Sequence, residues 1–497
     1  MVKAARLRVI QAGRGMIGGL ILAAAVVMLA GCSGLVEDKP KVVQINVPVP
    51  PSAPRTTGVE TPAMREHKEL VAYFGGEYHA PATERYLDEI LAKLAPASDT
   101  PGQTYKITIL NSPVVNAFAL PSGNIYVTRG LLALANDTSE VAAVMAHEIA
   151  HVTARHALQR AELEKRSALI SRAADVIDNP QKGRTFKTYA QLTLASFSRQ
   201  QEFEADQIGI RVIAKAGYDP FAASRFLVSL GRSTDLRQAT HPNGNGGKPD
   251  MMATHPSTPE RVAHAVAIAR GISAPGIGDV GHDRYLAAIE GMLYGDDPAE
   301  GFVRGRTFIH PKLGFAFTAP ESFVLENSAQ AVLGVTEDGS EALRLDRVHV
   351  TPDMTLQAYL NSGWIDGLQP SSAEAIVVNG LPAITAVAKA ESWTFRLAAI
   401  RVGPEVYRLT FAARDLTPTV DADFRTAIDT FRRITPEEVR AIRPMRIATV
   451  TAGPNDTVDS LSARMAVPDH PLETFKVLNG MDGGSVVAGQ RYKLIVE

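Results

Sequence analysis

The chain has 497 residues, a net charge of −2 at pH 7 and a single cysteine. This length is enough for about three domains of usual size, each with its own hydrophobic core. One cysteine excludes a disulfide framework and a cysteine-ligated metal site. The near-zero charge favours no particular partner. Because no basic stripe with interleaved aromatic residues is present, nucleic acid is not expected as a partner.

Residues 1–31 have the layout of a secretory signal. Basic residues precede an apolar run from Met16 to Ala30, which is too short to span a membrane comfortably. The run ends in Leu-Ala-Gly-Cys32, which resembles a bacterial lipobox and so implies cleavage before Cys32 and its lipidation. Ser33 follows, and by the same resemblance this implies the periplasmic face of the outer membrane. The alternative is an ordinary signal peptide with an incidental cysteine.

Residues 32–60 are rich in proline and valine, which predicts an extended tether. The next part, residues 61–275, is predicted to be mainly helical with a small sheet. We expect helices at Thr61–Tyr73 and Ala82–Leu94, a strand at Tyr105–Leu110, and a hairpin in which Ala117–Leu120 and Asn124–Thr128 flank Pro-Ser-Gly.

The stretch Asn136–Gln159 predicts a buried amphipathic helix, because its apolar residues recur at helical spacing and Asp137 and Glu140 have the spacing of a capping box. It contains His147-Glu148-Ile-Ala-His151. Two histidines four residues apart share one helix face, where two neutral imidazoles can bind zinc and the carboxylate between them can take a proton from water. The same string also arises by chance, so a third ligand is needed to distinguish a zinc site from a chance match.

A metzincin would need Gly at position 154 and His at position 157, but both are alanine and His156 is out of phase. A later helix is therefore required. The stretch Thr188–Lys215, followed by Ala-Gly-Tyr-Asp-Pro, predicts one. Within it Glu202 and Asp206 share a face. We take Glu202 as the third ligand and Asp206 as the carboxylate that orients a zinc-bound imidazole, with Glu204 pointing elsewhere into solvent.

The string from Asn116 to Leu132 (NAFALPSGNIYVTRGLL), then HEIAH, then EFEAD resembles the gluzincin peptidases that include HtpX, the CAAX prenyl proteases and the BepA-like periplasmic enzymes. The likeness covers roughly residues 61–272. It implies a zinc endopeptidase that holds one Zn²⁺ through His147, His151 and Glu202, with Glu148 as general base. For the BepA-like enzymes it also implies misfolded or unassembled cell-envelope proteins as substrates.

Two further sets of residues follow from this resemblance. Asn116, Ala117 and Phe118 lie just before the catalytic helix, and we expect them to hold an extended substrate on an edge strand; the alternative is a turn residue and a core aromatic. His255 in the His-Pro…Arg string is expected to cap the resting zinc, to stabilise the oxyanion, or both. The alternative for His255 is a surface residue before a proline. The glycine-rich stretch 241–249 predicts a lid.

Residues 276–435 predict an α+β domain of unknown role, with strands from Arg306 onward and helices at Thr355–Gly363 and Thr419–Arg433. Residues 436–497 resemble a LysM peptidoglycan-binding module of βααβ order. The segment departs from that pattern in a longer middle, 467–471, and in the absence of an aromatic residue from its first strand. The expected fold class is thus α+β multidomain. Two alternatives to an envelope endopeptidase stay open: a chaperone-like factor with a silent metal site, and a peptidoglycan-associated factor with little proteolysis.

Overall fold

The computed structural model describes residues 61–162, 196–240 and 250–497, apart from residues 329–330, 337, 391 and 468. The predicted signal segment, the lipidation site Cys32, the tether, residues 188–195 of the helix predicted from Thr188 and the glycine-rich stretch 241–249 lie outside these residues. That helix was predicted too long, because residues 196–198 are not helical and the helix begins at Arg199. Within the described part, no helix is both long and apolar enough to cross a bilayer.

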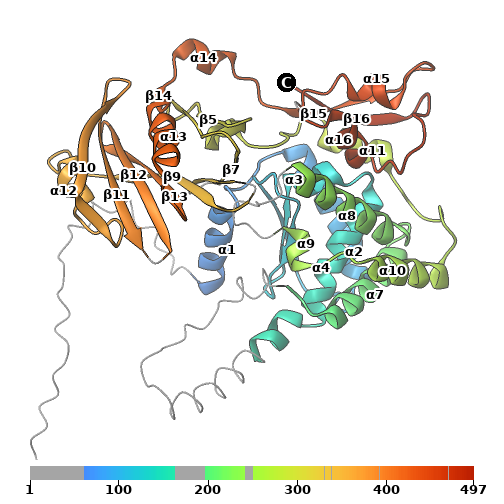
Figure 1. Ribbon diagram of the computed structural model, residues 1–497. Helices are drawn as coiled ribbons and strands as arrows, with labels where there is room; N and C mark the ends of the chain where they lie inside the picture. The colour runs from blue at the N-terminus through green and yellow to red at the C-terminus, as the bar shows by residue number, and fades with distance from the viewer. Residues whose placement is uncertain are drawn as a thin grey trace, which may run out of the picture. The chain divides into compact units, whose positions relative to one another are not determined.

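The first part of the structure is mainly helical, as predicted, with one small sheet (Figure 1). Two helices precede the sheet, and the helix that carries HEIAH follows it. The elements are α1 (Pro62–Tyr73), α2 (Pro81–Ala97), β1 (Lys106–Leu110), β2 (Ala117–Ala119), β3 (Asn124–Thr128), α3 (Arg129–Leu134), α4 (Thr138–Thr153), α7 (Arg199–Lys215), α8 (Ala222–Thr240), α9 (Met251–Thr254), α10 (Pro259–Ile272) and α11 (His282–Ile289).

The sheet has the order β1-β3-β2. β1 runs parallel to β3, and β2 pairs antiparallel with β3 through the predicted hairpin. Gly123 sits in the turn between them at φ 91°, a conformation that residues with a side chain rarely adopt. β2 and β1 are therefore the two edge strands of this sheet.

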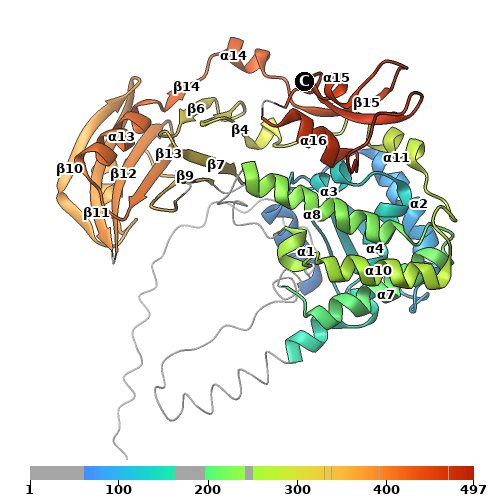
Figure 2. The same ribbon diagram turned by 45° about the vertical axis from the view of Figure 1, so that its right-hand side comes forward.

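α4 lies at the centre of the largest hydrophobic core, and its residues 138–151 are all buried. Helices α2, α7 and α8 and strand β2 pack around it. The view in Figure 2 also shows α7 beside α4, with α10 next to it. α11 and residues after it join the same core through Tyr285, Leu286 and Ile289, so this core continues past residue 275.

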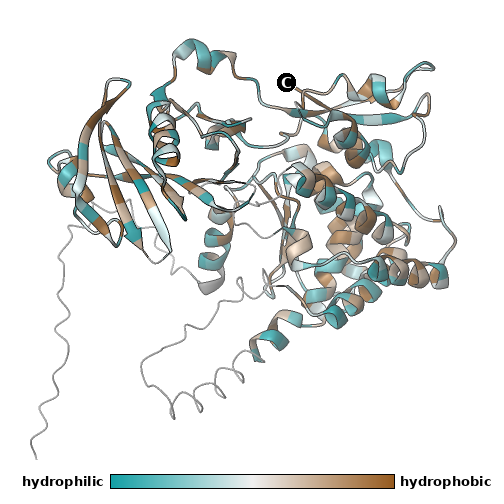
Figure 3. Ribbon diagram, in the orientation of Figure 1, coloured by the Kyte–Doolittle hydropathy of each residue, from teal (hydrophilic) through white to brown (hydrophobic). Residues whose placement is uncertain are grey.

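Residues 298–441 contain two antiparallel sheets, with their own hydrophobic core. The seven-stranded sheet has the order β10-β11-β12-β13-β9-β8-β7, and the four-stranded sheet has the order β14-β6-β5-β4. Hydrophobic and hydrophilic residues alternate along several of these strands in Figure 3, in agreement with the alternating burial of β13. The elements are η1 (Pro298–Glu300), β4 (Phe302–Arg304), β5 (Thr307–His310), β6 (Phe315–Thr318), β7 (Phe323–Asn327), β8 (Val332–Thr336), β9 (Glu341–His349), α12 (Leu356–Leu360), β10 (Leu368–Val378), β11 (Leu381–Ala390), β12 (Trp393–Val402), β13 (Glu405–Ala413), α13 (Pro418–Asp429), β14 (Arg432–Arg433) and α14 (Pro436–Ala441).

The C-terminal segment has the predicted βααβ order: β15 (Arg446–Thr451), α15 (Val458–Ser462), α16 (Pro471–Leu478) and β16 (Arg491–Val496). β15 and β16 pair antiparallel. Apolar residues of this segment belong to the same core as α4. Lys493 is 1% exposed, and its Nζ lies 2.8, 3.3 and 2.6 Å from the carbonyl oxygens of Ala133, Leu134 and Ala135 at the end of α3. The chain is thus a mixed helix-and-sheet protein of several parts, while the LysM assignment stays a prediction.

Candidate metal centre

Helix α4 brings His147 and His151 to one point. Asp137 caps the helix by accepting a hydrogen bond from the Glu140 backbone N–H at 2.8 Å, while the Glu140 carboxylate accepts from the Asn136 N–H, one residue earlier than in a standard capping box. The Nε2 atoms of His147 and His151 lie 3.0 Å apart, and both side chains are buried. Two imidazole nitrogens that face each other so closely suit a shared metal ion.

Helix α7 adds the carboxylate of Glu202. Ser198 and Gln201 form a capping box that starts this helix, and Glu202 stands in its first turn. Its Oε2 lies 3.5 Å from Nε2 of His147, and its Oε1 lies 3.6 Å from Nε2 of His151. The helices can approach this closely because Gly209 faces α4; an added Cβ there would stand 3.1 Å from the His147 backbone nitrogen.

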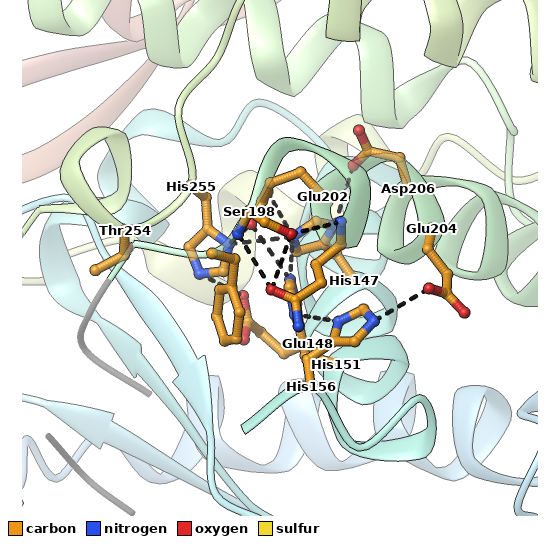
Figure 4. A network of polar contacts seen from close by, with 12 residues as sticks. His147, Glu148, His151, His156, Ser198, Glu202, Glu204, Asp206, Thr254 and His255 are labelled. Atoms are coloured by element: carbon orange, nitrogen blue, oxygen red, sulfur yellow. Dashed lines mark hydrogen bonds and ion pairs between the residues drawn. The ribbon is translucent and has the colours of Figure 1, made fainter. Parts of the chain in front are cut away.

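His255 completes the group. It follows α9, is 1% exposed, and places Nδ1 3.0 Å from Oε1 of Glu202 and 3.3 Å from Nε2 of His147. One ligand atom each from His147, His151, Glu202 and His255 lies within 4.8 Å of the others (Figure 4). Among the described residues, Oε1 of Glu148 and Nε2 of His255 have no hydrogen-bond partner, although both atoms are buried. Two buried polar atoms without hydrogen bonds, beside three imidazoles and a carboxylate, fit a zinc ion.

Asp206 and Arg261 support this group from behind. Asp206 Oδ1 lies 3.0 Å from Nδ1 of His147, which is the contact expected of a carboxylate that orients a metal-bound imidazole. Arg261 grips Asp206 with two hydrogen bonds of 2.8 and 2.7 Å and places Nη1 2.8 Å from Oε2 of Glu202. Arg261 is the arginine of the His-Pro…Arg string, which by itself indicated no role for it. Its position in the first turn of α10, five residues after the His-Pro pair, was the only signal.

The electrostatics of the site follow from burial and from these contacts. Burial acts to lower the pKa of His147, but hydrogen bonds to Asp206 and Glu202 outweigh it and raise that pKa to about 10. Burial and the neighbouring His147 together lower the pKa of His151. Burial opposes ionisation of Glu202 and Asp206, yet the adjacent His255, Arg261 and His147 groups hold both carboxyl pKa values below their usual range.

Glu148 differs from these carboxylates. It is 1% exposed, and burial raises its pKa against the opposing effect of His255 and His147. The Ala119 backbone of β2 hydrogen-bonds to it, and its Oε1 lies 3.6 Å from Nε2 of His255. Ala119, Glu148, His151 and Phe197 line a small pocket. A carboxylate with a raised pKa at such a pocket is suited to accept and return a proton.

The predicted substrate residues lie on β2 and just before it. Asn116 and Ala117 are fully buried. The Phe118 side chain packs in a separate core, with its ring stacked on Tyr126 at 4.9 Å between centroids. The Phe118 side chain thus occupies the place of a core aromatic. A role of these three residues in holding substrate stays a prediction, and for Phe118 it would depend on the backbone of the edge strand.

Two residues near the centre have partners that the sequence did not indicate. His156 was judged out of phase, and the structure gives it no contact as a metal ligand; instead its Nδ1 lies 2.9 Å from Nδ1 of His151. Glu204 is half-exposed and was expected in solvent, but its Oε2 lies 3.4 Å from Nε2 of His156. No sequence spacing predicted either contact.

Comparison with known proteins agrees with this geometry. The model of Peptidase family M48 matches residues 81–269. The Beta-barrel assembly-enhancing protease of Escherichia coli K12 is 31% identical over 195 residues, which are 37% of this chain and 38% of that protein. Mitochondrial metalloendopeptidase OMA1 is 34% identical in Arabidopsis thaliana (34% of this chain, 32% of that protein) and 31% identical in Schizosaccharomyces pombe (40% and 58%).

Each match therefore spans less than two thirds of the relative. Among solved structures, cyanobacterial PsbP from Synechocystis aligns with 32% of this chain and 97% of its own length, at 14% identity and a TM-score of 0.20. That score is too low to carry an argument about fold. The family model instead matches the part of the chain that holds the HEIAH helix, Glu202 and Arg261. Residues 81–269 of this protein are thus similar to Peptidase family M48.

Proposed function

We propose that the protein is a zinc-dependent endopeptidase of the cell envelope that cleaves misfolded or unassembled envelope proteins. The observation that carries the proposal is the convergence of His147, His151 and Glu202 from two helices, with the buried Glu148 beside them. The cell envelope and its proteins are proposed because bacterial relatives are beta-barrel assembly-enhancing proteases.

Zinc would be held by His147, His151 and Glu202 and, when bound, supplies Lewis acidity that polarises water and a peptide carbonyl. Glu148 acts as the general base: it accepts the proton of the attacking water and returns it to the leaving amine. Burial raises the pKa of Glu148, which makes it a stronger base. Asp206 keeps the proton of His147 on Nδ1, so that Nε2 of His147 stays available as a ligand.

His255 is assigned two successive roles. With Nδ1 3.0 Å from Glu202 and 3.3 Å from His147, the ring lies where it can take the fourth ligand position of the resting site. Its Nε2 lies on the side of Glu148. With substrate present, a donor at His255 would stabilise the developing oxyanion.

Substrate binding is proposed along β2. The edge strand has β3 on one side, and its Ala119 backbone reaches the Glu148 carboxylate, so an extended peptide added beside residues 116–119 would pass the general base. Backbone pairing recognises any extended chain. Broad sequence specificity follows, and it suits substrates that are recognised because they are unfolded.

The parts of the chain outside the peptidase region are proposed to locate the protein in the cell envelope and to bring substrate to it. Lipidation of Cys32 would anchor the protein to the periplasmic face of the outer membrane, with residues 33–60 as a tether. Residues 436–497 are a candidate contact to peptidoglycan, which a pull-down of cell-wall sacculi with the full chain can test. Residues 276–435 are proposed to present or dock substrate.

The decisive experiment uses the protein without residues 1–32 and its Glu148→Gln variant. Zinc content and casein cleavage are measured for both, with Glu260→Gln as a matched control at an exposed position. Glu148→Gln should retain zinc and lose cleavage by at least about 10²-fold, because it keeps the shape of the side chain and removes the base. Equal cleavage by Glu148→Gln and the parent protein would remove Glu148 from the mechanism. Bound zinc with no Glu148-dependent cleavage would favour the chaperone-like alternative.

A further inference from the structure

We propose that His156 and Glu204 form a hydrogen-bond chain that positions His151 as a zinc ligand. This inference rests on the proposed function, because it concerns how the same metal is held. His147 has the carboxylate of Asp206 behind it at 3.0 Å. Among the described residues, no carboxylate contacts Nδ1 of His151; that atom instead faces Nδ1 of His156, and Glu204 lies on the far side of His156 (Figure 4).

The atoms that meet determine the direction of the chain. Nε2 of His151 faces the metal group, 3.0 Å from Nε2 of His147. A histidine that binds zinc through Nε2 is neutral and carries its proton on Nδ1. That Nδ1–H points at Nδ1 of His156, 2.9 Å away, which must therefore accept. His156 then carries its proton on Nε2, and this N–H donates to Oε2 of Glu204 at 3.4 Å.

Each of the two histidines thus has one tautomer that satisfies both of its contacts. If His156 carried its proton on Nδ1, two N–H groups would face each other at 2.9 Å, at a ring that is fully buried. Glu204 is half-exposed and can accept from His156 while the rest of its carboxylate stays in water. The chain therefore disfavours rotation of the His151 ring and leaves its Nε2 lone pair directed at the metal.

A break in the helix makes this contact possible. α4 ends at Thr153, and Arg155 adopts φ 57°, in the left-handed region that residues other than glycine rarely enter. The chain is helical again at 156–162. In one continuous helix, residues five apart point in directions roughly 140° different, so His156 would point away from His151. The left-handed turn brings its ring back against His151, with centroids 4.9 Å apart. A strained residue beside a metal ligand is consistent with a local function.

Phe197 closes the other side of the ring. It stacks on His151 with a centroid distance of 4.0 Å and an interplanar angle of 28°. The stacking restricts tilt of the imidazole, while the Nδ1 contact restricts its rotation in the plane. His151 is held by packing and by a directed hydrogen bond, and only the second of these depends on the nitrogen of His156.

Substitutions at positions 156 and 204 separate hydrogen bonding from packing. His156→Phe keeps a ring and removes the acceptor, whereas His156→Asn keeps an acceptor near the Nδ1 position. Glu204→Ala removes the end of the chain and Glu204→Gln retains an acceptor there. Glu260→Ala is the matched control, because Glu260 is similarly exposed and bonds to Arg199 at the start of α7. Zinc affinity is measured for the protein without residues 1–32 by competition with a chromogenic chelator. The absorption of the Co²⁺-substituted protein reports ligand geometry.

We expect His156→Phe to weaken zinc binding by about 10- to 100-fold, the range observed when groups behind metal ligands are removed. His156→Asn should recover most of that loss, and Glu204→Ala should weaken binding more than Glu204→Gln or the control. The Co²⁺ spectrum should change in His156→Phe and be restored in His156→Asn. Thermal melts in chelator identify any variant that fails to fold. If His156→Phe fails to fold, the variants of the half-exposed Glu204 test the inference in its place.

Wild-type zinc affinity in both His156→Phe and Glu204→Ala would overturn the inference and leave the proposed function intact. So would an equal loss in His156→Phe and His156→Asn, since packing alone would then explain it. Failure of the parent protein to bind zinc would instead overturn the proposed function.

Discussion

Replacement of Arg261 by methionine should destabilise the metal-site region by about 3–5 kcal/mol. One guanidinium here meets four acceptors: both oxygens of Asp206 at 2.8 and 2.7 Å, Oε2 of Glu202 at 2.8 Å, and the Pro256 carbonyl at 3.1 Å. Arg261 is 3% exposed, and the two carboxylates are 5% and 1% exposed. Removing one member of a buried ion pair leaves an uncompensated charge and costs this much in other proteins. Here two carboxylates lose the same partner, which places the expected value in the upper half of the range.

Urea unfolding followed by circular dichroism at 222 nm measures this effect, because many of the longer helices pack around α4 and α7. With a urea dependence of about 3 kcal/mol per M, the midpoint should fall by about 1–2 M in chelator. Saturating zinc should recover part of the loss, since a cation would compensate Glu202 but would not replace the hydrogen bonds of Asp206. Arg261→Lys should lower the midpoint by less than Arg261→Met does, because an ammonium keeps the charge but lacks the planar, two-pronged geometry of the guanidinium.

Arg270→Met is the matched control, an exposed arginine on the same helix α10. It should shift the midpoint by less than about 0.2 M, as expected for a surface substitution. If Arg261→Met shifted the midpoint no more than this control, the carboxylates would not need Arg261. Arg261 would then not be the residue that stabilises the two buried carboxylates of the metal site.

Three other predictions concern packing, the C-terminal segment and pH. Gly209→Ala should weaken zinc binding and cost about 1–3 kcal/mol, because its Cβ would stand 3.1 Å from the His147 backbone; zinc titration and urea unfolding measure the two effects. Lys493→Met should cost about 2–3 kcal/mol in the same unfolding assay, because three buried carbonyl oxygens lose their donor; unchanged stability would mean that relief of the buried ammonium offsets those bonds. Burial lowers the pKa of His310 to about 4 from 6.5, so the unfolded chain takes up a proton between these pH values while the folded chain does not. Stability should therefore fall as pH drops from about 6.5 to 4, and His310→Gln should flatten this loss, as followed by fluorescence of the two tryptophans, both of which lie within residues 356–402 of the same part of the chain.

The metal group could be predicted from sequence because helical periodicity is a strong local constraint. His147 and His151 are one turn apart on any regular helix, and Glu202 and Asp206 are too, so only the meeting of the two helices was left to the resemblance. The structure brings the four side chains together at the distances given above. The hairpin before α4 was predicted equally well, since Pro-Ser-Gly between two alternating segments is a local signal.

Contacts that depend on a departure from regular geometry could not be predicted. His156 was judged out of phase as a metal ligand, and its contact with His151 is of another kind, which depends on the left-handed conformation of Arg155. Nothing in an Ala-Arg-His sequence signals such a turn, because neither residue before the histidine favours positive φ as glycine does. Phe118 posed a different problem: alternation along a strand predicts that neighbours face opposite sides but does not say which side faces the metal.

The C-terminal segment shows how tertiary packing changes the meaning of a local pattern. In Arg-Tyr-Lys-Leu-Ile-Val, alternation around a lysine predicts a strand with that lysine in water, yet Lys493 is 1% exposed and bonds to the end of α3. α3 leads directly into the turn that starts α4 at Asp137. Burial lowers the pKa of Lys493 to about 7, while Glu140 in the first turn of α4 opposes that shift. Because an unpaired buried ammonium is costly, this lysine ties β16 to the start of the helix that carries His147 and His151. A segment that resembles a separate binding module is thereby part of the same core as the metal centre, and detaching it would expose that core at the base of α4.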